Sequence, residues 1–132
     1  MTTELNFIGA ISTPYTEIHQ CPNNIQFDGP LCEVTLYDEF KEGLTGLEDG
    51  QQVLILYWLY DANRAAVKQP TCRAGVEKGT FALRSPHRPN PIGAAVLTIE
   101  KREEGRLTVR GLDCLNGTKV IDIKPAIYRE LL

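Results

Sequence analysis

Apolar and polar positions alternate along much of the chain with the two-residue period of half-buried strands. This alternation predicts strands over residues 5–12, 31–36, 80–84, 106–112 and 119–124, and the largely apolar segment 94–99 predicts another. Residues 52–60 are apolar on both faces, so this strand is expected at the centre of the sheet. One short helix is predicted over residues 39–44, with Asp38 as its N-cap.

Six or seven strands with a single short helix favour an antiparallel β-barrel or sandwich, because the strand-helix alternation of a parallel sheet is absent. A length of 132 residues suits one domain with its own core. We therefore expect residues 1–132 to form a single all-β, mainly antiparallel domain. Two long polar segments, 13–30 and 61–78, are interpreted as ordered loops at the same end of the molecule as the proline-rich segment 79–93.

The proline-rich segment is stiff and polar at once. Pro86, Pro89 and Pro91 each fix their own φ angle and bias the preceding residue towards extended geometry. Such a connection can hold side chains in place, and this one carries Arg84, His87, Arg88 and Asn90. A proline-rich hairpin with a solvated basic tip is the alternative interpretation.

The net charge of −3 is unusual for a dedicated nucleic-acid binder, so any contact with nucleic acid needs a local basic patch. The candidate patch is Arg84, Arg88, Lys119 and Lys124. The four cysteines contain no C-x-x-C pair, which favours reduced structural thiols. No apolar run approaches the length of a membrane span, and the N-terminus does not resemble a signal peptide. We therefore expect a cytoplasmic protein that makes no contact with a membrane.

Few residues suggest chemistry by themselves. His19 and His87 lack a second histidine at ligand spacing, so no metal site is predicted. Among the acids, Asp61 ends the central strand, Asp113 precedes an Asn-Gly turn and Asp122 lies within the last strand. We expect Asp122 to be partly buried and paired with a base, because buried Asp is otherwise unusual.

Two long motifs carry a resemblance to a known family. The first is Gly79-x-Phe-Ala-x-Arg-Ser-Pro-x-Arg-Pro-Asn-Pro-Ile-Gly93, and the second is Gly111-Leu-Asp-x-Leu-Asn-Gly-Thr-x-Val-Ile-Asp-Ile-Lys-Pro125. With the opening Ile8-Gly-x-Ile-x-Thr-Pro-Tyr15, they resemble the TsaA-like family, also called TrmO or YaeB, over almost the whole chain. The resemblance implies a small dimeric β-barrel that uses S-adenosyl-L-methionine, bound near the subunit interface. It also implies N6-methylation of threonylcarbamoyladenosine next to the tRNA anticodon.

The resemblance also implies roles for individual residues. The implied cofactor-binding residues are Pro22, Asn23, Asn24, Tyr60, Asp61, Arg84, Ala94, Asn116, Gly117, Thr118 and Lys119. The substrate-binding residues would be His87, Arg88, Asn90 and Lys124. A half-buried Arg84 would hold the cofactor carboxylate, and a solvent-exposed Arg88 would contact the acceptor. The catalytic base is unassigned, with Asp61 and Asp113 as the acids nearest the predicted pocket.

Two alternatives remain open beside this reading. The chain could be a non-catalytic module that binds S-adenosylmethionine or a nucleotide, or a methyltransferase for a different acceptor. tRNA and a second copy of the chain are the expected partners.

Overall fold

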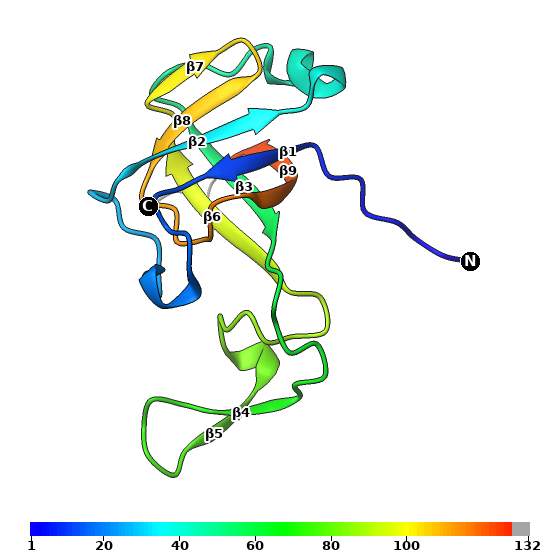
Figure 1. Cartoon of the computed structure of the whole chain (residues 1–132), viewed down its shortest axis with the longest axis vertical. Helices are drawn as coiled ribbons and strands as arrows, with labels where there is room; N and C mark the ends of the chain where they lie inside the picture. Colours follow the sequence, from blue (N-terminus) through cyan, green and yellow to red (C-terminus); the bar gives the residue numbers. More distant parts are fainter. Residues whose placement is uncertain (128–132) are drawn as a thin grey trace.

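The computed structural model describes residues 1–127 of the 132-residue chain (Figure 1). The regular elements of the described residues are β-strands and three short 3₁₀ helices. The strands are β1 (Gly9–Ser12), β2 (Leu31–Leu36), β3 (Gln52–Trp58), β4 (Lys68–Pro70), β5 (Glu77–Gly79), β6 (Ile92–Thr98), β7 (Lys101–Glu103), β8 (Arg106–Arg110) and β9 (Thr118–Pro125). The 3₁₀ helices are η1 (Ile18–Gln20), η2 (Asp38–Leu44) and η3 (Thr80–Ala82).

Seven strands form one antiparallel sheet in the order β6-β3-β9-β1-β2-β8-β7. β3 lies inside this sheet between β6 and β9, as its two apolar faces predict. β6 also comes close to β8, although the two strands are five places apart in the order, so the sheet must curl on itself. The predicted all-β antiparallel class is confirmed. Closure into a barrel stays a prediction, because β6 and β7 end the sheet within the described residues.

The inner face of the curled sheet holds the hydrophobic core. Side chains alternate between buried and half-buried along β3, and Val53 and Ile55 are completely buried. Val34 of β2, Leu107 of β8 and Val120 of β9 meet them in the same cluster. Burying an aliphatic side chain of this size contributes about 1.5–3 kcal/mol, so this cluster fixes the register of the sheet.

Residues 60–91 leave the sheet after β3 and return to it at β6. Figure 1 shows this segment, hereafter the arm, projecting away from the sheet with the β4–β5 hairpin at its far end. The buried Thr80 holds the arm together, because its hydroxyl donates to the Ala66 carbonyl at 3.0 Å and accepts from Gln69 Nε2 at 2.9 Å. The predicted irregular loop over residues 61–78 therefore contains a short hairpin.

The predicted strand over residues 80–84 is wrong. Residues Thr80–Ala82 form η3, in which Thr80 is buried and Phe81 is 81% exposed. The Thr80 N–H donates to the Val67 carbonyl at 2.8 Å, and the Leu83 N–H donates to the Thr80 carbonyl at 3.2 Å. These tertiary and turn hydrogen bonds override the alternating pattern, which put Phe81 and Leu83 on one face of a strand.

The predicted short helix is observed as η2, but its predicted cap is wrong. Tyr37 occupies the N-cap position without a side-chain hydrogen bond. Asp38 lies in the first turn instead, where its carboxylate pairs with Lys41 Nζ at 2.8 Å. The first strand is also shorter than predicted, since it begins at Gly9. No helix within residues 1–127 combines the length and the apolar character needed to cross a membrane.

Candidate functional site

Three irregular parts of the chain lie toward one end of the sheet, hereafter the loop end: residues 13–30, the arm and the turn 113–118. Figure 1 shows residues 13–30 and the arm on the same side of the sheet, which agrees with the sequence prediction. The Asn116 N–H donates to the Tyr15 carbonyl at 2.7 Å, and Asn116 Oδ1 accepts from the Thr13 N–H at 3.1 Å. The opening motif and the second motif therefore build one unit.

Asn116 and Gly117 form the exposed tip of this unit. Gly117 has a φ angle of 88°, which favours glycine, and its N–H donates to the Ile11 carbonyl at 2.7 Å. The Thr118 hydroxyl donates to the Leu115 carbonyl at 2.7 Å and is nearly buried. Of the three predicted cofactor residues in this turn, Asn116 and Gly117 are thus available to a ligand, while Thr118 closes the turn.

A buried tyrosine joins the second motif to the sheet. Tyr57, the last inward-facing residue of β3, is 2% exposed and donates its hydroxyl to Asp113 Oδ1 at 2.8 Å. Burial raises the pKa of Tyr57 far above its usual value, and the charge of Asp113 adds to this shift. The ring packs on Gly93, where a Cβ atom would lie 2.3 Å from Tyr57 Cε2. The last glycine of the proline-rich motif therefore makes room for Tyr57.

The two motif arginines have the opposite environments to those predicted. Arg84 is exposed, and its Nη2 donates to the Ala94 carbonyl at 3.2 Å. Arg88 is half-buried, and its Nη1 donates to the carbonyls of Leu83 and Ser85, each at 2.9 Å. The prediction failed because it extended the strand pattern through residue 84, whereas the chain turns at η3 and folds around the Arg88 guanidinium. Arg88 is thus occupied by its own loop.

The other predicted substrate residues lie in two separate places. His87 Nδ1 accepts from the Asn63 N–H at 3.0 Å, so the imidazole joins the two halves of the arm. Asn90 is exposed in the same loop. Lys124 lies on β9, where its Nζ is 3.1 Å from Asp122 Oδ2. The predicted pairing of a partly buried Asp122 with a base is therefore confirmed, and the pairing occupies Lys124.

The predicted residues near the end of β3 lie beside an aromatic surface. Tyr60 is 54% exposed, and Asp61 has a left-handed φ angle of 60°. Lys119 Nζ donates to the Tyr37 hydroxyl at 3.1 Å and lies 5.7 Å from the centroid of that ring. The hydrogen bond to Tyr37 raises the pKa of Lys119, and the charge of Tyr60 adds to this increase. Lys119 therefore lies toward Tyr37 and Tyr60, with its ammonium group already engaged.

Residues 21–24 border the loop end from the other side. Pro22 is half-buried, while Asn23 and Asn24 are exposed. Burial raises the pKa of the Cys21 thiol, and the charge of Asp113 contributes to the shift. Cys21 therefore lies within reach of the charge of Asp113.

The cysteines fit structural roles better than catalytic ones. All four are free thiols, and Cys32 and Cys114 are buried in the core. Burial raises the pKa of Cys114 to about 12, so the nucleophilic thiolate does not form near neutral pH. Within residues 1–127, no group of three or more His, Cys, Asp and Glu side chains could hold a metal ion.

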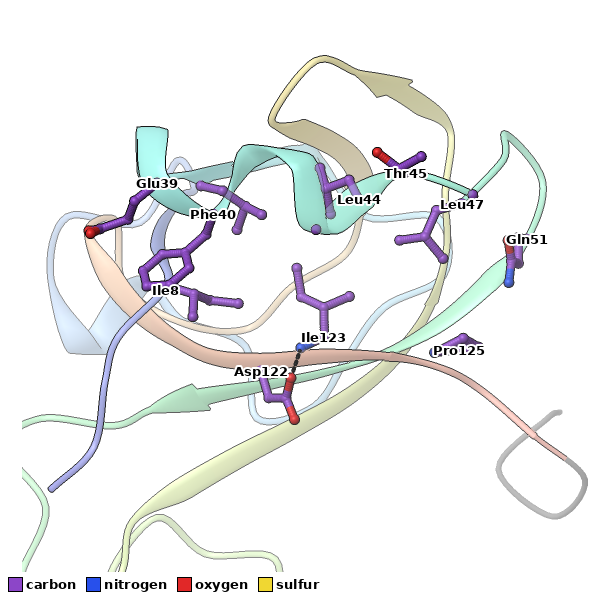
Figure 2. A pocket seen from close by; sticks show the side chains of 13 residues that line it. Ile8, Glu39, Phe40, Leu44, Thr45, Leu47, Gln51, Asp122, Ile123 and Pro125 are labelled. Atoms are coloured by element: carbon purple, nitrogen blue, oxygen red, sulfur yellow. Dashed lines mark hydrogen bonds between the residues drawn. The ribbon is translucent and has the colours of Figure 1, made fainter. Parts of the chain in front are cut away.

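A cavity of about 610 Å³ lies between η2 and β9, and none of the predicted site residues lines it (Figure 2). Its lining is mostly apolar and includes Ile8, Phe40, Leu44, Leu47 and Ile123. Figure 2 shows the Asp122 carboxylate on the side of β9 that faces away from η2, so this charge does not enter the cavity. The cavity can accept an apolar group, but it offers little for a charged cofactor. Sequence reasoning missed it because η2 and β9 are far apart in the chain.

The arm is basic although the whole chain is acidic. Residues 61–91 carry six Lys and Arg side chains and two acidic ones, against a net charge of −3 for the chain. Within the described residues none of these six cations forms an ion pair, since every ion pair lies outside the arm. Arg64 instead stacks 5.1 Å from the centroid of the Trp58 ring and donates to the Pro89 carbonyl. Most of the positive charge of the arm remains available to a partner.

Several known proteins are similar to this chain in sequence. Residues 10–129 match the family model described as tRNA-methyltransferase O N-terminal domain. An Archaeoglobus fulgidus protein described as a probable S-adenosyl-L-methionine-binding protein is 42% identical over 95% of this chain and 34% of its own length. A second Archaeoglobus fulgidus protein, described as an S-adenosyl-L-methionine-binding protein, is 38% identical over 89% of this chain and 84% of its own length.

A solved structure agrees with the sequence matches. The crystal structure of TrmO from Pseudomonas aeruginosa superposes with a TM-score of 0.78 at 32% identity, over 100% of this chain and 60% of that chain. The chain thus spans about a third of the first relative and about three fifths of the solved protein. The strand order and these matches place it in a class of small all-β, mainly antiparallel domains. The particular family is that of the tRNA-methyltransferase O N-terminal domain, to which this chain belongs.

Proposed function

We propose that this chain is an S-adenosylmethionine-dependent methyltransferase that methylates N6 of threonylcarbamoyladenosine next to the anticodon of tRNA. The observation that carries the proposal is the match of residues 10–129 to the tRNA-methyltransferase O domain, whose two motifs are connected through Tyr57, since its ring packs on Gly93 and its hydroxyl donates to Asp113. S-adenosylmethionine supplies an activated methyl group. The protein's task is alignment of the acceptor nitrogen with that group.

The residues at the loop end fit this cofactor chemically. Arg84 keeps most of its N–H donors free beyond the bond to the Ala94 carbonyl, and a guanidinium binds a carboxylate with charge-assisted hydrogen bonds. The open turn at Asn116 and Gly117 leaves exposed polar atoms for an adenine edge. Pro22 and Asn23 border the same space from residues 13–30. This donor set matches a molecule with a carboxylate, cationic groups and a nucleobase.

The basic arm supports tRNA as the acceptor. The phosphate backbone contributes most of the affinity of proteins for nucleic acids through Lys and Arg. Six such residues are concentrated in residues 61–91, and Lys68, Arg73 and Lys78 are exposed. The overall net charge of −3 therefore does not argue against a tRNA partner. His87 and Asn90, on the exposed loop of the same arm, are the proposed acceptor contacts.

The proton on the acceptor nitrogen needs a base if it is not sufficiently acidic. Asp61 and Asp113 are the two candidates. Asp61 is exposed, and it is held in a left-handed conformation that non-glycine residues rarely adopt. Such backbone strain is concentrated at functional sites, which supports Asp61. Asp113 is half-buried and already accepts a hydrogen bond from Tyr57.

We also propose that the chain works as a homodimer joined through the arm. Val67 is 74% exposed and Phe81 is 81% exposed, both on the arm, and a second copy could cover them. The Phe81→Asp variant should be a monomer in sedimentation at micromolar concentration, while the wild type should be a dimer. A wild-type monomer under these conditions would rule out the dimer.

The remaining parts of the proposal concern the whole chain. The single core shared by six strands of the curled sheet supports one domain over residues 1–132, closed as a small β-barrel. Free thiols and a tRNA partner support a cytoplasmic location. Hydrogen exchange with a single cooperative unfolding transition for β1 and β6 would support one domain.

A methyl-transfer assay on tRNA that carries threonylcarbamoyladenosine but lacks the N6 methyl group tests the main proposal. We expect transfer of the labelled methyl group to that nucleoside, and no transfer to tRNA without the threonylcarbamoyl group. The second candidate is a non-catalytic binding module, which the descriptions of the Archaeoglobus fulgidus relatives as binding proteins favour. Calorimetric binding of S-adenosylmethionine without any transfer would support the module. Transfer to another acceptor would keep the methyltransferase and change its substrate.

A further inference from the structure

The hydroxyl of Tyr57 is a buried polar group with one described partner, the Asp113 carboxylate. Tyr57 is 2% exposed, and its ring is fixed between the core and Gly93. The hydroxyl donates to Asp113 Oδ1 at 2.8 Å. Burying a hydroxyl lowers stability unless the hydroxyl is hydrogen-bonded, whereas a Phe at position 57 would need no partner. The presence of Tyr57 and its hydrogen bond to Asp113 therefore needs an explanation.

Only one oxygen of the Asp113 carboxylate, Oδ1, accepts a hydrogen bond within the described residues. Within residues 1–127 its carboxylate accepts no further side-chain or backbone hydrogen bond beyond that from Tyr57 and joins no ion pair. The group is half-buried, where an unpaired charge is unfavourable. Its charge acts on the Tyr15 hydroxyl and the Cys21 thiol, which border the loop end. Oδ2 is therefore available to a cationic group at the loop end.

An unpaired cation lies close to this unpaired anion. Arg84 Nη2 donates to the carbonyl of Ala94, the residue after Gly93 on which the Tyr57 ring packs, and the charge of Arg84 lowers the pKa of Tyr57 against the larger effects of burial and Asp113. Arg84 makes no ion pair among the described residues, and it donates only to the Ala94 carbonyl. Two opposite charges that are held near each other, but not paired, complement a zwitterion. The α-amino-acid end of S-adenosylmethionine is such a group, because an ammonium and a carboxylate share one carbon.

We propose that Tyr57 is a positioning residue that holds the Asp113 carboxylate for the ammonium group of S-adenosylmethionine, while Arg84 binds the carboxylate of the same ligand. The inference rests on the proposed function, because it assumes that this cofactor binds at the loop end. It assigns Asp113 to cofactor binding and leaves Asp61 as the candidate base. Tyr57 acts only through Asp113, since its ring is buried and its hydroxyl points to that carboxylate.

Calorimetry with three ligands tests this assignment. S-adenosylmethionine has two positive charges, on the ammonium and on the sulfonium. S-adenosylhomocysteine has the ammonium but no sulfonium, and methylthioadenosine lacks the whole amino-acid end. In the Asp113→Asn variant we expect tenfold or greater weakening of the first two ligands and less than twofold change for methylthioadenosine. Tyr57→Phe keeps the ring on Gly93 and should weaken the same two ligands about threefold to tenfold. Asp49→Asn, in a turn outside the loop end, is the matched control and should change none of the three.

The double variant separates positioning from general damage. If Tyr57 works through Asp113, Tyr57→Phe should cause little further loss in the Asp113→Asn background. Equal weakening of methylthioadenosine in either variant would overturn the inference, because this ligand has no ammonium. Weakening of S-adenosylmethionine without S-adenosylhomocysteine would assign Asp113 to the sulfonium and overturn it too. Unchanged affinities in both variants would overturn this inference but leave the proposed function standing. A wild type that does not bind S-adenosylmethionine would overturn both.

Discussion

At the scale of single residues, the motif glycine Gly93 has a packing role that the sequence does not display. A Cβ atom at this position would lie 2.3 Å from Tyr57 Cε2 and 2.7 Å from two further ring atoms. A distance this short forces either the ring or β6 to move. A glycine fits at position 93 of this chain because a buried tyrosine from β3 occupies the space that a side chain would need.

Gly93→Ala should lower the free energy of unfolding by about 1–3 kcal/mol, the usual cost of overpacking a core. The tyrosine hydroxyl would also move away from Asp113, so S-adenosylmethionine binding should weaken. Gly43→Ala is the matched control, because a Cβ atom there meets nothing within 4 Å and Gly43 does not have a positive φ angle. Urea unfolding of the two variants measures the difference, and equal stabilities would contradict the packing role.

The two motif arginines should separate stability from cofactor affinity. Arg88 donates to the Leu83 and Ser85 carbonyls, so Arg88→Ala should lower the free energy of unfolding by about 1–2 kcal/mol. Arg84 is exposed, and Arg84→Ala should leave the unfolding midpoint nearly unchanged while weakening S-adenosylmethionine by well over tenfold. Thermal unfolding and calorimetry on the same samples test both statements. The reverse pattern, with Arg84→Ala the less stable variant, would show that Arg84 is the structural arginine.

At the scale of elements, Thr80 holds the arm together. Its hydroxyl bonds to the Ala66 carbonyl and to Gln69, whose Nε2 also donates to the His87 carbonyl. Thr80→Val keeps the shape of the side chain but leaves these buried partners unsatisfied, a loss of about 1–3 kcal/mol. We expect faster proteolysis within the arm and faster exchange of the amide hydrogen of residue 80.

Thr98→Val, on the exposed face at the end of β6, is the control for this substitution. It should change neither proteolysis nor exchange. Protection of the arm that survives in Thr80→Val would mean that the β4–β5 hairpin and the contacts of His87 hold the arm without the Thr80 hydroxyl.

The strands of the sheet were predictable from sequence because their burial follows the two-residue period. β2 was predicted at its observed bounds, and β3 was placed correctly inside the sheet. The arm was not predictable in the same way. Thr80 is buried through hydrogen bonds to residues 66, 67 and 69, whereas the apolar Phe81 next to it is exposed, so polarity gives the wrong direction for both.

The candidate site was predictable only where the motifs themselves contain it. Arg84, Asp113 and Asn116 belong to the two motifs, and the sequence could name them as candidates for that reason. Tyr57 belongs to no motif, and its role depends on the pairing of β3 with β6, which puts it opposite Gly93. Arg84 and Arg88 have the opposite burial to that predicted because the chain turns at η3, and no local sequence pattern predicts this turn.

At the scale of the whole molecule, charge is divided between the sheet and the arm. With a net charge of −3, the chain should be repelled weakly by tRNA at long range. The excess of cations in residues 61–91 creates an attractive region at the loop end. This distribution would orient a polyanion towards the arm, so the acceptor would approach from the same end as the predicted cofactor site.

The salt dependence of tRNA binding can locate this region. Each phosphate contact made by a Lys or Arg contributes about 0.7–0.9 to the slope of log affinity against log salt concentration. Lys78 lies exposed on β5 and forms no ion pair within the described residues, so Lys78→Gln should reduce the slope by about 0.7–0.9. Lys101 is equally exposed on β7, outside the arm, and Lys101→Gln should leave the slope unchanged. Fluorescence anisotropy titrations of the two variants between 50 and 200 mM salt, roughly the range over which such contacts are screened, make the comparison. Equal slopes in both variants would show that tRNA does not contact Lys78, and the acceptor would then have to bind away from this part of the β4–β5 hairpin.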